Sequence, residues 1–415
     1  MKVFTNKGGR MKHTTILLSY SGGLDTSAII PWLKQTYDCS VIAYCSNLGN
    51  APDENLIGQK AIELGADEFI FEDLQQTFCE NFVWPMLQAG ATYQNSYLLG
   101  TAIARPLIAE RIARYAIKYN ATGIAHGATG KGNDQLRFER AWAALIPEVQ
   151  VIAPWKLWHF KGRHELIQYL AKNNFTYVDQ EKEFSVDVNL LHRSCEGGIL
   201  EDISRSYDPQ KVYQWTTPPE LVSSNNITDI QLGFNKGRLK SINGTLMSEF
   251  DLLTTLNKIA GQHGIGVLDL VEERTNGVKS RGIYETPGGT LIAFALQNLK
   301  NMSWDRKTLS VAHYLSQQYG ELIYDGLWHS ETRKYLSGFF SQACEVLNGE
   351  ISIKLQGSQM IVTGRSSQFN LYNQDLVSFE SDQWDLNQSA QGFCKTMSYS
   401  LSQAAQQRKR FESLI

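Results

Sequence analysis

The chain lacks any apolar segment approaching the ~18 residues that a membrane-spanning helix requires. It also lacks a charge surplus, because 39 Lys and Arg residues face 42 Asp and Glu residues, for a formal net charge of −3. Such a balance provides no overall field to hold a polyanion. With 42% hydrophobic and 20% charged residues, the composition is that of a folded protein. We therefore expect small-molecule ligands and neither a nucleic-acid nor a membrane partner.

Motifs of metal and covalent catalysis are missing as well. The sequence has no C-x-x-C pair, no H-E-x-x-H string and no G-x-S-x-G string. The six cysteines are scattered: Cys39, Cys45, Cys79, Cys195, Cys344 and Cys394. This pattern predicts no disulfide framework, no zinc site and no covalent nucleophile. We expect reduced cysteines in a cytoplasmic protein.

The length of 415 residues favours two domains, since one domain usually takes ~100–200 residues. In the first part, short apolar runs alternate with amphipathic segments. The runs cover residues 15–20, 40–46, 68–71, 123–126, 149–153 and 176–178. This alternation predicts an α/β fold with a doubly wound parallel sheet, whose ligands bind beyond the carboxyl ends of the strands. Residues 1–14 are expected to form a loose N-terminal arm ahead of this domain, which spans 15–178.

After residue 178 the pattern changes. Alternating runs at 230–234 and 351–355 are followed by hairpin-type turns, and helices are expected over 250–260, 309–319 and 331–347. Residues 208–226, with three prolines, are expected to form a loop. We predict an α+β domain over 179–393 and a C-terminal helical tail over 394–415, whose polar part could equally be a solvated charged helix.

The string Ser-Gly-Gly-Leu-Asp-Thr-Ser at residues 21–27 directly follows the first predicted strand. Two glycines allow close backbone approach to an anion, and the hydroxyl groups add donors at a helix N-terminus, whose dipole favours negative charge. The string therefore predicts a phosphate-binding loop. The alternative is an ordinary strand–helix turn with a polar cap.

A second glycine-rich string, Gly-Ala-Thr-Gly-Lys-Gly-Asn-Asp-Gln, occupies residues 127–135. It is not a Walker A loop, because Lys131 is followed by glycine. Its Lys131 could neutralise the charge of a phosphate, and its polar side chains could bind an amino-acid zwitterion. The alternative is a glycine-rich connection without a ligand. A polar turn at 46–49 follows the second strand. The doubly wound fold places all three loops at one edge of the sheet, which indicates a shared nucleotide site.

The string at 21–27 resembles the pyrophosphate-binding loop of N-type ATP pyrophosphatases. With the strings at 127–139 and 279–287 added, the sequence resembles the argininosuccinate synthase family from about residue 16 to about residue 393. The resemblance implies a ligase of arginine biosynthesis that joins citrulline and aspartate through a citrulline-adenylate, with ATP and Mg²⁺, and releases AMP and pyrophosphate. It also implies an ATP-binding domain, a synthetase domain and a tail that makes contacts in a homotetramer.

The resemblance assigns roles residue by residue. ATP is expected at Ser19, Tyr20, Ser21, Gly22, Gly23, Leu24, Asp25, Thr26, Ser27, Ser46 and Gly127. Aspartate is expected at Thr101, Thr129, Asn133 and Asp134. Citrulline is expected at Tyr97, Asn133, Arg137, Ser185, Ser194, Glu272 and Tyr284. Asp25 would orient the phosphate loop or a water on the metal, and Lys131 would offset phosphate charge.

Two of these assignments have a structural alternative: Asp134 could be a helix N-cap, and Glu272 could lie at an exposed strand end.

Two other functions are alternatives to the ligase. A tRNA-modifying ATP pyrophosphatase would use the same first loop, but should show a basic face and a reactive cysteine. A non-catalytic nucleotide-binding regulator should have lost residues of the reacting site, whereas here the strings are complete.

Overall fold

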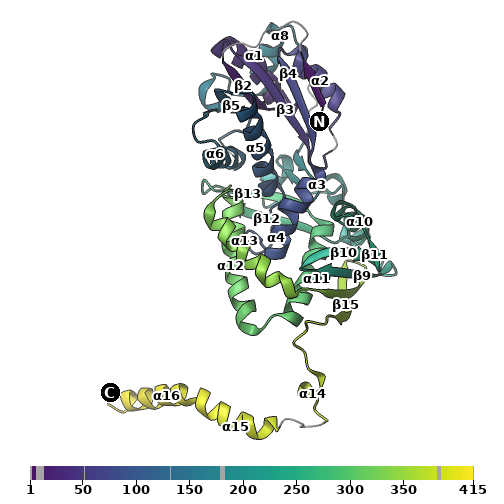
Figure 1. The fold of residues 1–415 in the computed structure, drawn as a ribbon, viewed down its shortest axis with the longest axis vertical. Coiled ribbons are helices and arrows are strands. Elements are labelled where there is room, and N and C mark those ends of the chain that lie inside the picture. The colour runs from purple at the N-terminus through teal and green to yellow at the C-terminus, as the bar shows by residue number, and fades with distance from the viewer. Residues whose placement is uncertain are drawn as a thin grey trace. The chain divides into compact units, whose positions relative to one another are not determined.

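The computed structural model describes residues 2–5, 14–50, 52–130, 132–177, 183–380 and 385–414. The chain divides into two compact units, Met1–Phe369 and Asn370–Ile415 (Figure 1). The second unit contains three helices in its described residues: α14 (Gln374–Val377), α15 (Leu386–Met397) and α16 (Tyr399–Glu412). The tail boundary expected at residue 394 thus lies inside α15. In the described ranges, no helix is both long and apolar enough to cross a membrane.

The first unit begins with a sheet of strand order β1-β4-β3-β2-β5-β6. Five of its strands run parallel: β2 (Thr15–Ser19), β3 (Ser40–Asn47), β4 (Glu68–Asp73), β5 (Gly123–His126) and β6 (Gln150–Ile152). They confirm the first five predicted strands. The apolar runs are continuous rather than alternating because both faces of a parallel sheet are covered.

Two features of this part differ from the prediction. Strand β1 (Lys2–Thr5) pairs antiparallel with β4, so part of the expected loose arm is an edge strand. Residues 176–177 form no strand, and Val178 lies outside the described residues. The aromatic residue of this run packs against a helix instead of pairing in the sheet. The centroid of the Tyr177 ring lies 4.3 Å from Lys60 Nζ.

Helices cover both faces of the sheet (Figure 1). Ile16 and Leu18 of β2 pack in the layer of α1 (Leu24–Tyr37), α2 (Glu54–Glu63) and α8 (Arg163–Lys172). Leu17, on the opposite face, packs in the layer of α5 (Gly100–Lys118) and α6 (Asp134–Leu145). This arrangement confirms the doubly wound α/β fold.

Between β4 and α5 the chain forms three consecutive helical segments. They are α3 (Gln75–Phe78), a π-helical stretch (Cys79–Val83) and α4 (Trp84–Ala89). Two further short helices are α7 (Pro154–Leu157), whose Trp155 packs in the layer of α1, α2 and α8, and α9 (Pro209–Val212). Apart from α9 and a 3₁₀ turn at Pro219–Leu221, residues 208–226 are irregular, as expected for a loop.

The rest of the first unit is α+β, as predicted. A four-stranded antiparallel sheet has the order β12-β13-β8-β7. Its strands are β7 (Ser185–Val188), β8 (Arg193–Glu196), β12 (Val267–Glu273) and β13 (Lys279–Glu285). A five-stranded sheet has the order β11-β10-β9-β14-β15. Its strands are β9 (Ile227–Asn235), β10 (Arg238–Ile242), β11 (Thr245–Leu246), β14 (Gly349–Gln356) and β15 (Gln359–Ser366).

Both predicted hairpins are confirmed, joining β9 to β10 and β14 to β15. The predicted helices correspond to α10 (Glu249–Gln262), α12 (Arg306–Tyr324) and α13 (Glu331–Ala343). The sequence did not predict α11 (Pro287–Ser303), which is largely buried. Its first residues, Pro-Gly-Gly, are typical of a turn, but tertiary packing outweighs this local preference.

Candidate functional site

The phosphate loop predicted at 21–27 leads from the end of β2 into α1. Gly22 has a φ of 75°, a conformation that favours glycine. The hydroxyl oxygens of Ser21 and Thr26 lie 3.2 Å apart, and the Gly23 amide donates to Ser21 Oγ over 3.3 Å. Helix α1 begins at Leu24 with no side-chain cap from the described residues. The loop therefore leaves the positive end of the helix available to an anion, contrary to the capped-turn alternative.

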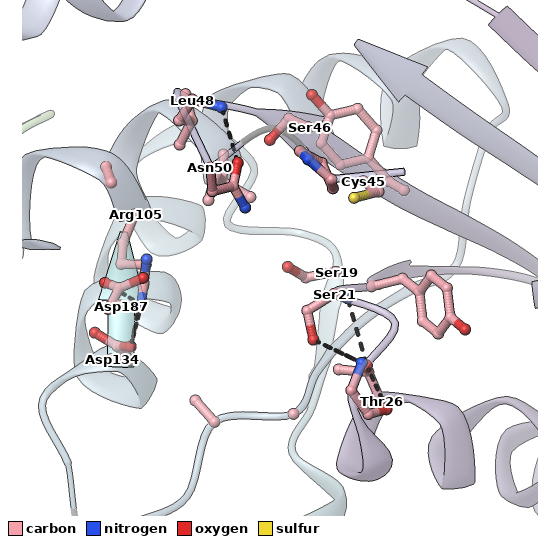
Figure 2. Close-up of a pocket in the computed structure, with 18 of the residues that line it drawn as sticks. Ser19, Ser21, Thr26, Cys45, Ser46, Leu48, Asn50, Arg105, Asp134 and Asp187 are labelled. Carbon is pink, nitrogen blue, oxygen red and sulfur yellow. Dashed lines mark hydrogen bonds and ion pairs between the residues drawn. The ribbon is translucent and has the colours of Figure 1, made fainter. Parts of the chain in front are cut away.

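A cavity of about 300 Å³ lies over this loop (Figure 2). The predicted nucleotide-binding residues that line it are Ser19, Tyr20, Ser21, Gly23, Leu24, Asp25, Thr26, Ser46 and Gly127. Asp25 lies in the first turn of α1, where burial raises the pKa of its carboxyl group. The cavity sits at the carboxyl ends of β2, β3 and β5, the place expected for a ligand of this fold.

Gly22 and Ser27 do not line this cavity. Ser27 is fully buried, because one step along the helix turns its side chain from the cavity to the core. Gly22 acts through its backbone, since its carbonyl accepts a hydrogen bond of 2.7 Å from Lys60 Nζ. The expectation that both contact ATP directly stays a prediction, which the lining of this cavity does not support. Lys131, the predicted phosphate lysine, lies outside the described residues.

A second cavity, of about 370 Å³, adjoins the first. Every predicted substrate-binding residue lines it: Tyr97, Thr101, Thr129, Asn133, Asp134, Arg137, Ser185, Ser194, Glu272 and Tyr284. They come from the segment before α5, α5 itself, the loop after β5, α6 and the four-stranded sheet. The fold thus brings residues from both halves of the first unit to one site.

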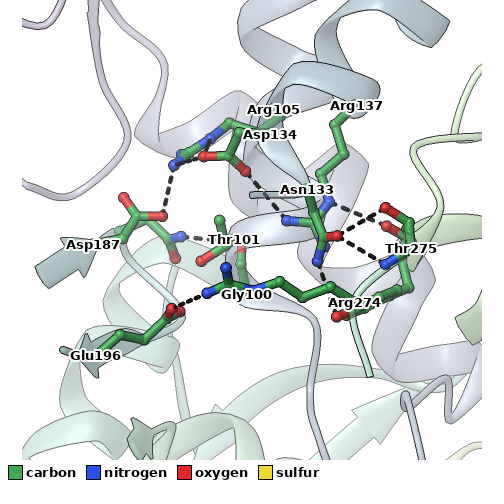
Figure 3. Close-up of polar contacts among 12 residues, drawn as sticks. Gly100, Thr101, Arg105, Asn133, Asp134, Arg137, Asp187, Glu196, Arg274 and Thr275 are labelled. Atoms are coloured by element: carbon green, nitrogen blue, oxygen red, sulfur yellow. Dashed lines mark hydrogen bonds and ion pairs between the residues drawn. The ribbon is translucent and has the colours of Figure 1, made fainter. Parts of the chain in front are cut away.

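Arg105 stands where the two cavities meet. It lines both, together with Ala128, Asp134 and Asp187. Its Nη2 lies 2.8 Å from Asp134 Oδ2 and 2.9 Å from Asp187 Oδ2 (Figure 3). Figure 2 shows this group across the nucleotide cavity from Ser21. Two carboxylates thus share one planar guanidinium, whose N–H groups donate to both of them.

Asp134 is the first residue of α6, and the N-cap position belongs to Asn133, so the N-cap role considered for Asp134 is wrong. Besides Arg105 it contacts Arg137, whose Nη1 lies 3.2 Å from Asp134 Oδ1. Burial alone would raise the pKa of Asp134, but the two arginine charges hold it below its ordinary value. The carboxyl group therefore stays ionised at neutral pH in contact with the substrate cavity.

Asn133 links the glycine-rich loop to the second half of the unit. Its Nδ2 donates to Tyr324 OH over 2.9 Å, while its Oδ1 accepts from the backbone and side chain of Thr275 over 3.0 and 2.9 Å (Figure 3). Both ends of the amide are thus occupied by protein groups. The geometry supports a role for Asn133 in fixing the loop.

Glu272 is a buried carboxylate, with only 5% of its surface exposed. Tyr284 OH donates to its Oε1 over 3.1 Å, whereas Oε2 has no hydrogen-bond partner among the described residues. Burial raises the pKa of Glu272. The ring of Tyr284 stacks on Tyr97 with centroids 4.3 Å apart. The exposed strand end considered as an alternative is therefore wrong, and the carboxylate is suited to receive a cationic group.

Four charged residues of the site were missed from the sequence: Arg105, Asp187, Glu196 and Arg274. All four have a periodic spacing from a predicted residue. Arg105 lies one helical turn after Thr101, and Asp187 and Glu196 each lie two positions after a predicted serine on the same strand face. Arg274 lies two positions after Glu272, one residue beyond the end of β12. Its Nη2 lies 2.8 Å from Glu196 Oε2, a pairing that only the β8–β13–β12 arrangement creates.

Comparisons with known proteins point to the same family over nearly the whole length of the chain. A family model described as "Arginosuccinate synthase N-terminal HUP domain" matches residues 15–176, and one described as "Arginosuccinate synthase C-terminal domain" matches residues 184–404. The argininosuccinate synthase of Carboxydothermus hydrogenoformans is 42% identical over 398 residues, covering 96% of this chain and 99% of that protein. That of Acetivibrio thermocellus is 42% identical over 379 residues, covering 91% and 93%.

A solved chain described as a predicted subunit of tRNA methyltransferase, from Methanocaldococcus jannaschii, is 13% identical. It covers 39% of this chain and 90% of its own, with a TM-score of 0.26, and therefore carries no argument about function.

Proposed function

The chain belongs to the argininosuccinate synthase family, and from this premise we propose that its two adjoining cavities hold ATP and the two amino-acid substrates. A member of this family is a ligase that forms a C–N bond. It condenses citrulline with aspartate at the expense of ATP, giving argininosuccinate, AMP and pyrophosphate. Membership of this family favours the ligase over the two alternatives considered from the sequence, a tRNA-modifying enzyme and a non-catalytic regulator.

The observation that carries the site assignment is the shared wall of the cavities. Arg105, Asp134 and Asp187 line both, so a ligand over the phosphate loop and a ligand near Glu272 approach each other at this wall. We assign the phosphates of ATP to the loop at 21–26, where Ser21 and Thr26 supply donors. The pyrophosphate leaving group is stabilised there by the positive end of α1.

Mg²⁺ is proposed to arrive with the nucleotide. No cluster of three or more metal-ligating side chains occurs in the described part of the chain. Magnesium bound with nucleotide phosphates needs only one or two carboxylates from the protein, and Asp25 lines the nucleotide cavity. The ion, when bound, neutralises charge on the phosphates. We propose that Lys131 adds to this neutralisation.

Citrulline is assigned to the end of the substrate cavity that contains Glu272. The unpartnered carboxylate oxygen of Glu272 can accept the α-ammonium group, while Ser185 and Ser194 offer hydroxyl donors. Tyr97 and Arg137 line the path toward the shared wall. The ureido oxygen can then face the α-phosphorus, which it attacks to form citrulline-adenylate as pyrophosphate leaves. Positioning supplies most of the rate in such a transfer.

Aspartate is assigned to the part of the cavity formed by Thr101, Thr129 and Asp134. Asp134 remains ionised beside its arginines, so it can hold the substrate ammonium group close to the activated carbon of citrulline-adenylate. The ammonium group gives up a proton to water, and the free amine then attacks the activated carbon, forms the new C–N bond and displaces AMP, which leaves with the former ureido oxygen. Asn133 contributes by holding the loop that carries Thr129.

We further propose a cytoplasmic homo-oligomer, a tetramer, that works without nucleic acid. Support for association comes from the second unit, whose helices expose large apolar side chains. These are Leu386, Phe393, Met397, Tyr399, Leu401 and Phe411. Such side chains usually mark an interaction surface.

The test follows the ureido oxygen. AMP formation is first measured with ATP, Mg²⁺, citrulline and aspartate, omitting each in turn. Citrulline labelled with heavy oxygen at the ureido position is then supplied in the complete reaction. If adenylation occurs, the label leaves with AMP when aspartate attacks. Label retained in argininosuccinate, or AMP oxygen taken from solvent, would exclude the adenylate route.

A further inference from the structure

His192 lies immediately behind the substrate cavity without lining it. The side chain is fully buried, and its Nε2 lies 2.9 Å from Oγ1 of Thr101, which does line the cavity. Gly100 packs against the ring so closely that a Cβ there would lie 2.3 Å from His192 Cγ. The ring also stacks on Tyr284 with centroids 5.9 Å apart. The imidazole is therefore fixed in place between the wall of the cavity and the core.

The environment of the ring determines which nitrogen carries its proton. Burial lowers the pKa of His192 to about 4, so the ring is neutral at pH 7, with one N–H and one bare nitrogen. Its Nδ1 is buried and has no hydrogen-bond partner in the described part of the chain. A buried N–H without an acceptor is rarer than an unused lone pair. The proton therefore belongs on Nε2, which donates to Thr101 Oγ1.

A second buried histidine shows the opposite arrangement. His263 Nε2 lies 2.8 Å from Thr228 Oγ1, and its Nδ1 lies 3.1 Å from the carbonyl oxygen of Gly357. A carbonyl only accepts, so Nδ1 carries the proton and Nε2 receives the Thr228 hydroxyl. Two histidine–threonine pairs of similar length thus have opposite polarity.

From this contrast we propose that His192 is a positioning residue that turns the Thr101 hydroxyl into a donor directed into the substrate cavity. Because Thr101 Oγ1 accepts from His192, its own hydrogen must point elsewhere, to the neighbouring hydroxyl of Tyr97, which also lines the cavity, or to an oxygen of a ligand in the cavity. The hydroxyl thus selects an anionic oxygen at this point and disfavours an ammonium group. If the proposed function holds, on which this step rests, that oxygen belongs to a carboxylate group of the substrate aspartate.

The orientation is tested directly by ¹⁵N NMR of protein labelled at histidine, with the His192 and His263 signals assigned from variants of each. The expected result is a protonated Nε2 and a bare Nδ1 for His192, and the reverse for His263. A protonated Nδ1 at His192 would overturn the proposal. This measurement needs no substrate, so it remains decisive if the enzyme fails to form AMP with citrulline and aspartate, an outcome that would reject the proposed function instead.

Kinetics test the consequence for specificity. His192→Met removes the donor at similar size and should raise the KM for aspartate by about tenfold or more, the effect of a lost hydrogen bond to a charged group. The KM values for citrulline and ATP should change less than about threefold. His192→Gln, which keeps an N–H donor, should restore most of the aspartate affinity. His263→Met is the matched control for loss of a buried histidine.

A double-mutant comparison isolates the pair. In a Thr101→Val background, His192→Met should add less than about twofold to the aspartate KM, because the hydroxyl it orients is already gone. Equal rises in all three KM values, or no rescue by His192→Gln together with full additivity in the double variant, would show that His192 acts by packing alone and would overturn the proposal.

Discussion

Arg105 Nη2 and Asp134 Oδ2 lie 2.8 Å apart on the wall shared by the nucleotide and substrate cavities. Arg105 belongs to α5 and Asp134 begins α6, so the contact joins the helix that follows Tyr97 to the loop that carries Thr129. The same guanidinium reaches Asp187 on β7. One side chain therefore holds three elements of the site in register.

Arg105→Lys should reduce kcat/KM for the complete reaction by on the order of 100-fold, because lysine keeps the charge but loses the planar fork that bridges two carboxylates. Steady-state kinetics measure the change, and circular dichroism checks that the fold is retained. The control is Arg114→Ala on the same helix, which removes an exposed pair with Glu110 and should change kcat/KM less than about twofold. Similar kinetics in both variants would contradict the role of Arg105.

Asp25→Ala should lower turnover by more than roughly tenfold without unfolding the protein, since a loop-proximal residue facing a ligand contributes more to function than to the core. Lys131→Ala is expected to do the same. Glu63→Ala, an exposed carboxylate of α2, is the control and should leave turnover unchanged. Turnover and melting temperature are measured for all variants. Wild-type kinetics in either of the first two would count against the nucleotide site.

Glu272→Gln should raise the KM for citrulline by about tenfold or more, because the amide lacks the charge that pairs with an ammonium group. The raised pKa of Glu272 also gives a pH dependence. As the pH falls through this pKa, the carboxylate is protonated and citrulline binding weakens. The citrulline KM of the wild type should therefore rise on the acid side, and that of Glu272→Gln should not follow it.

Glu273→Gln is the matched control for this prediction. Glu273 is the next residue of β12, but it is exposed and pairs with Lys279 Nζ over 2.8 Å. Its replacement should leave both the citrulline KM and its pH dependence unchanged. If Glu272→Gln behaves like this control, citrulline is held elsewhere.

Lys300→Met should raise the free energy of unfolding at pH 7. Lys300 is 4% exposed, and burial lowers the pKa of its ammonium group to about 8. Between pH 8 and its ordinary value of ~10.4, the unfolded chain binds more protons than the folded one, so the wild type gains stability as the pH rises. The advantage of the variant should therefore shrink over this window. Thermal unfolding at several pH values measures it, with exposed Lys307→Met as control.

Removal of residues 397–415 should shift the mass seen by light scattering to a smaller species, because this deletion takes away α16 with its exposed apolar side chains. A full-length variant with Lys409→Ala and Arg410→Ala changes the charge of the helix and keeps those side chains, so it should retain the mass of the wild type. An unchanged mass after truncation would contradict the proposal that the tail docks on another subunit.

Local sequence patterns were sufficient wherever the requirement is local. The run at 15–20 and the glycines that follow specify a buried strand and a tight turn within a dozen residues, and the structure has β2 and the phosphate loop there. The hairpin after β9 was equally predictable, because an alternating run is followed by the turn string Asn-Lys-Gly at 235–237, where Lys236 and Gly237 take the positive φ values typical of such a turn. Resemblance to a family then selected the residues of the second cavity.

Tertiary structure alone decided the pairings on which the site depends. Tyr284 lies opposite Ser194 only because β13 pairs with β8, and Arg105 meets Asp187 across 82 positions of sequence. The burial of Glu272 and the polarity of the His192–Thr101 contact likewise depend on which elements pack around them. Periodicity reports which face a residue occupies, but the neighbour across that face is determined by packing between segments far apart in the chain.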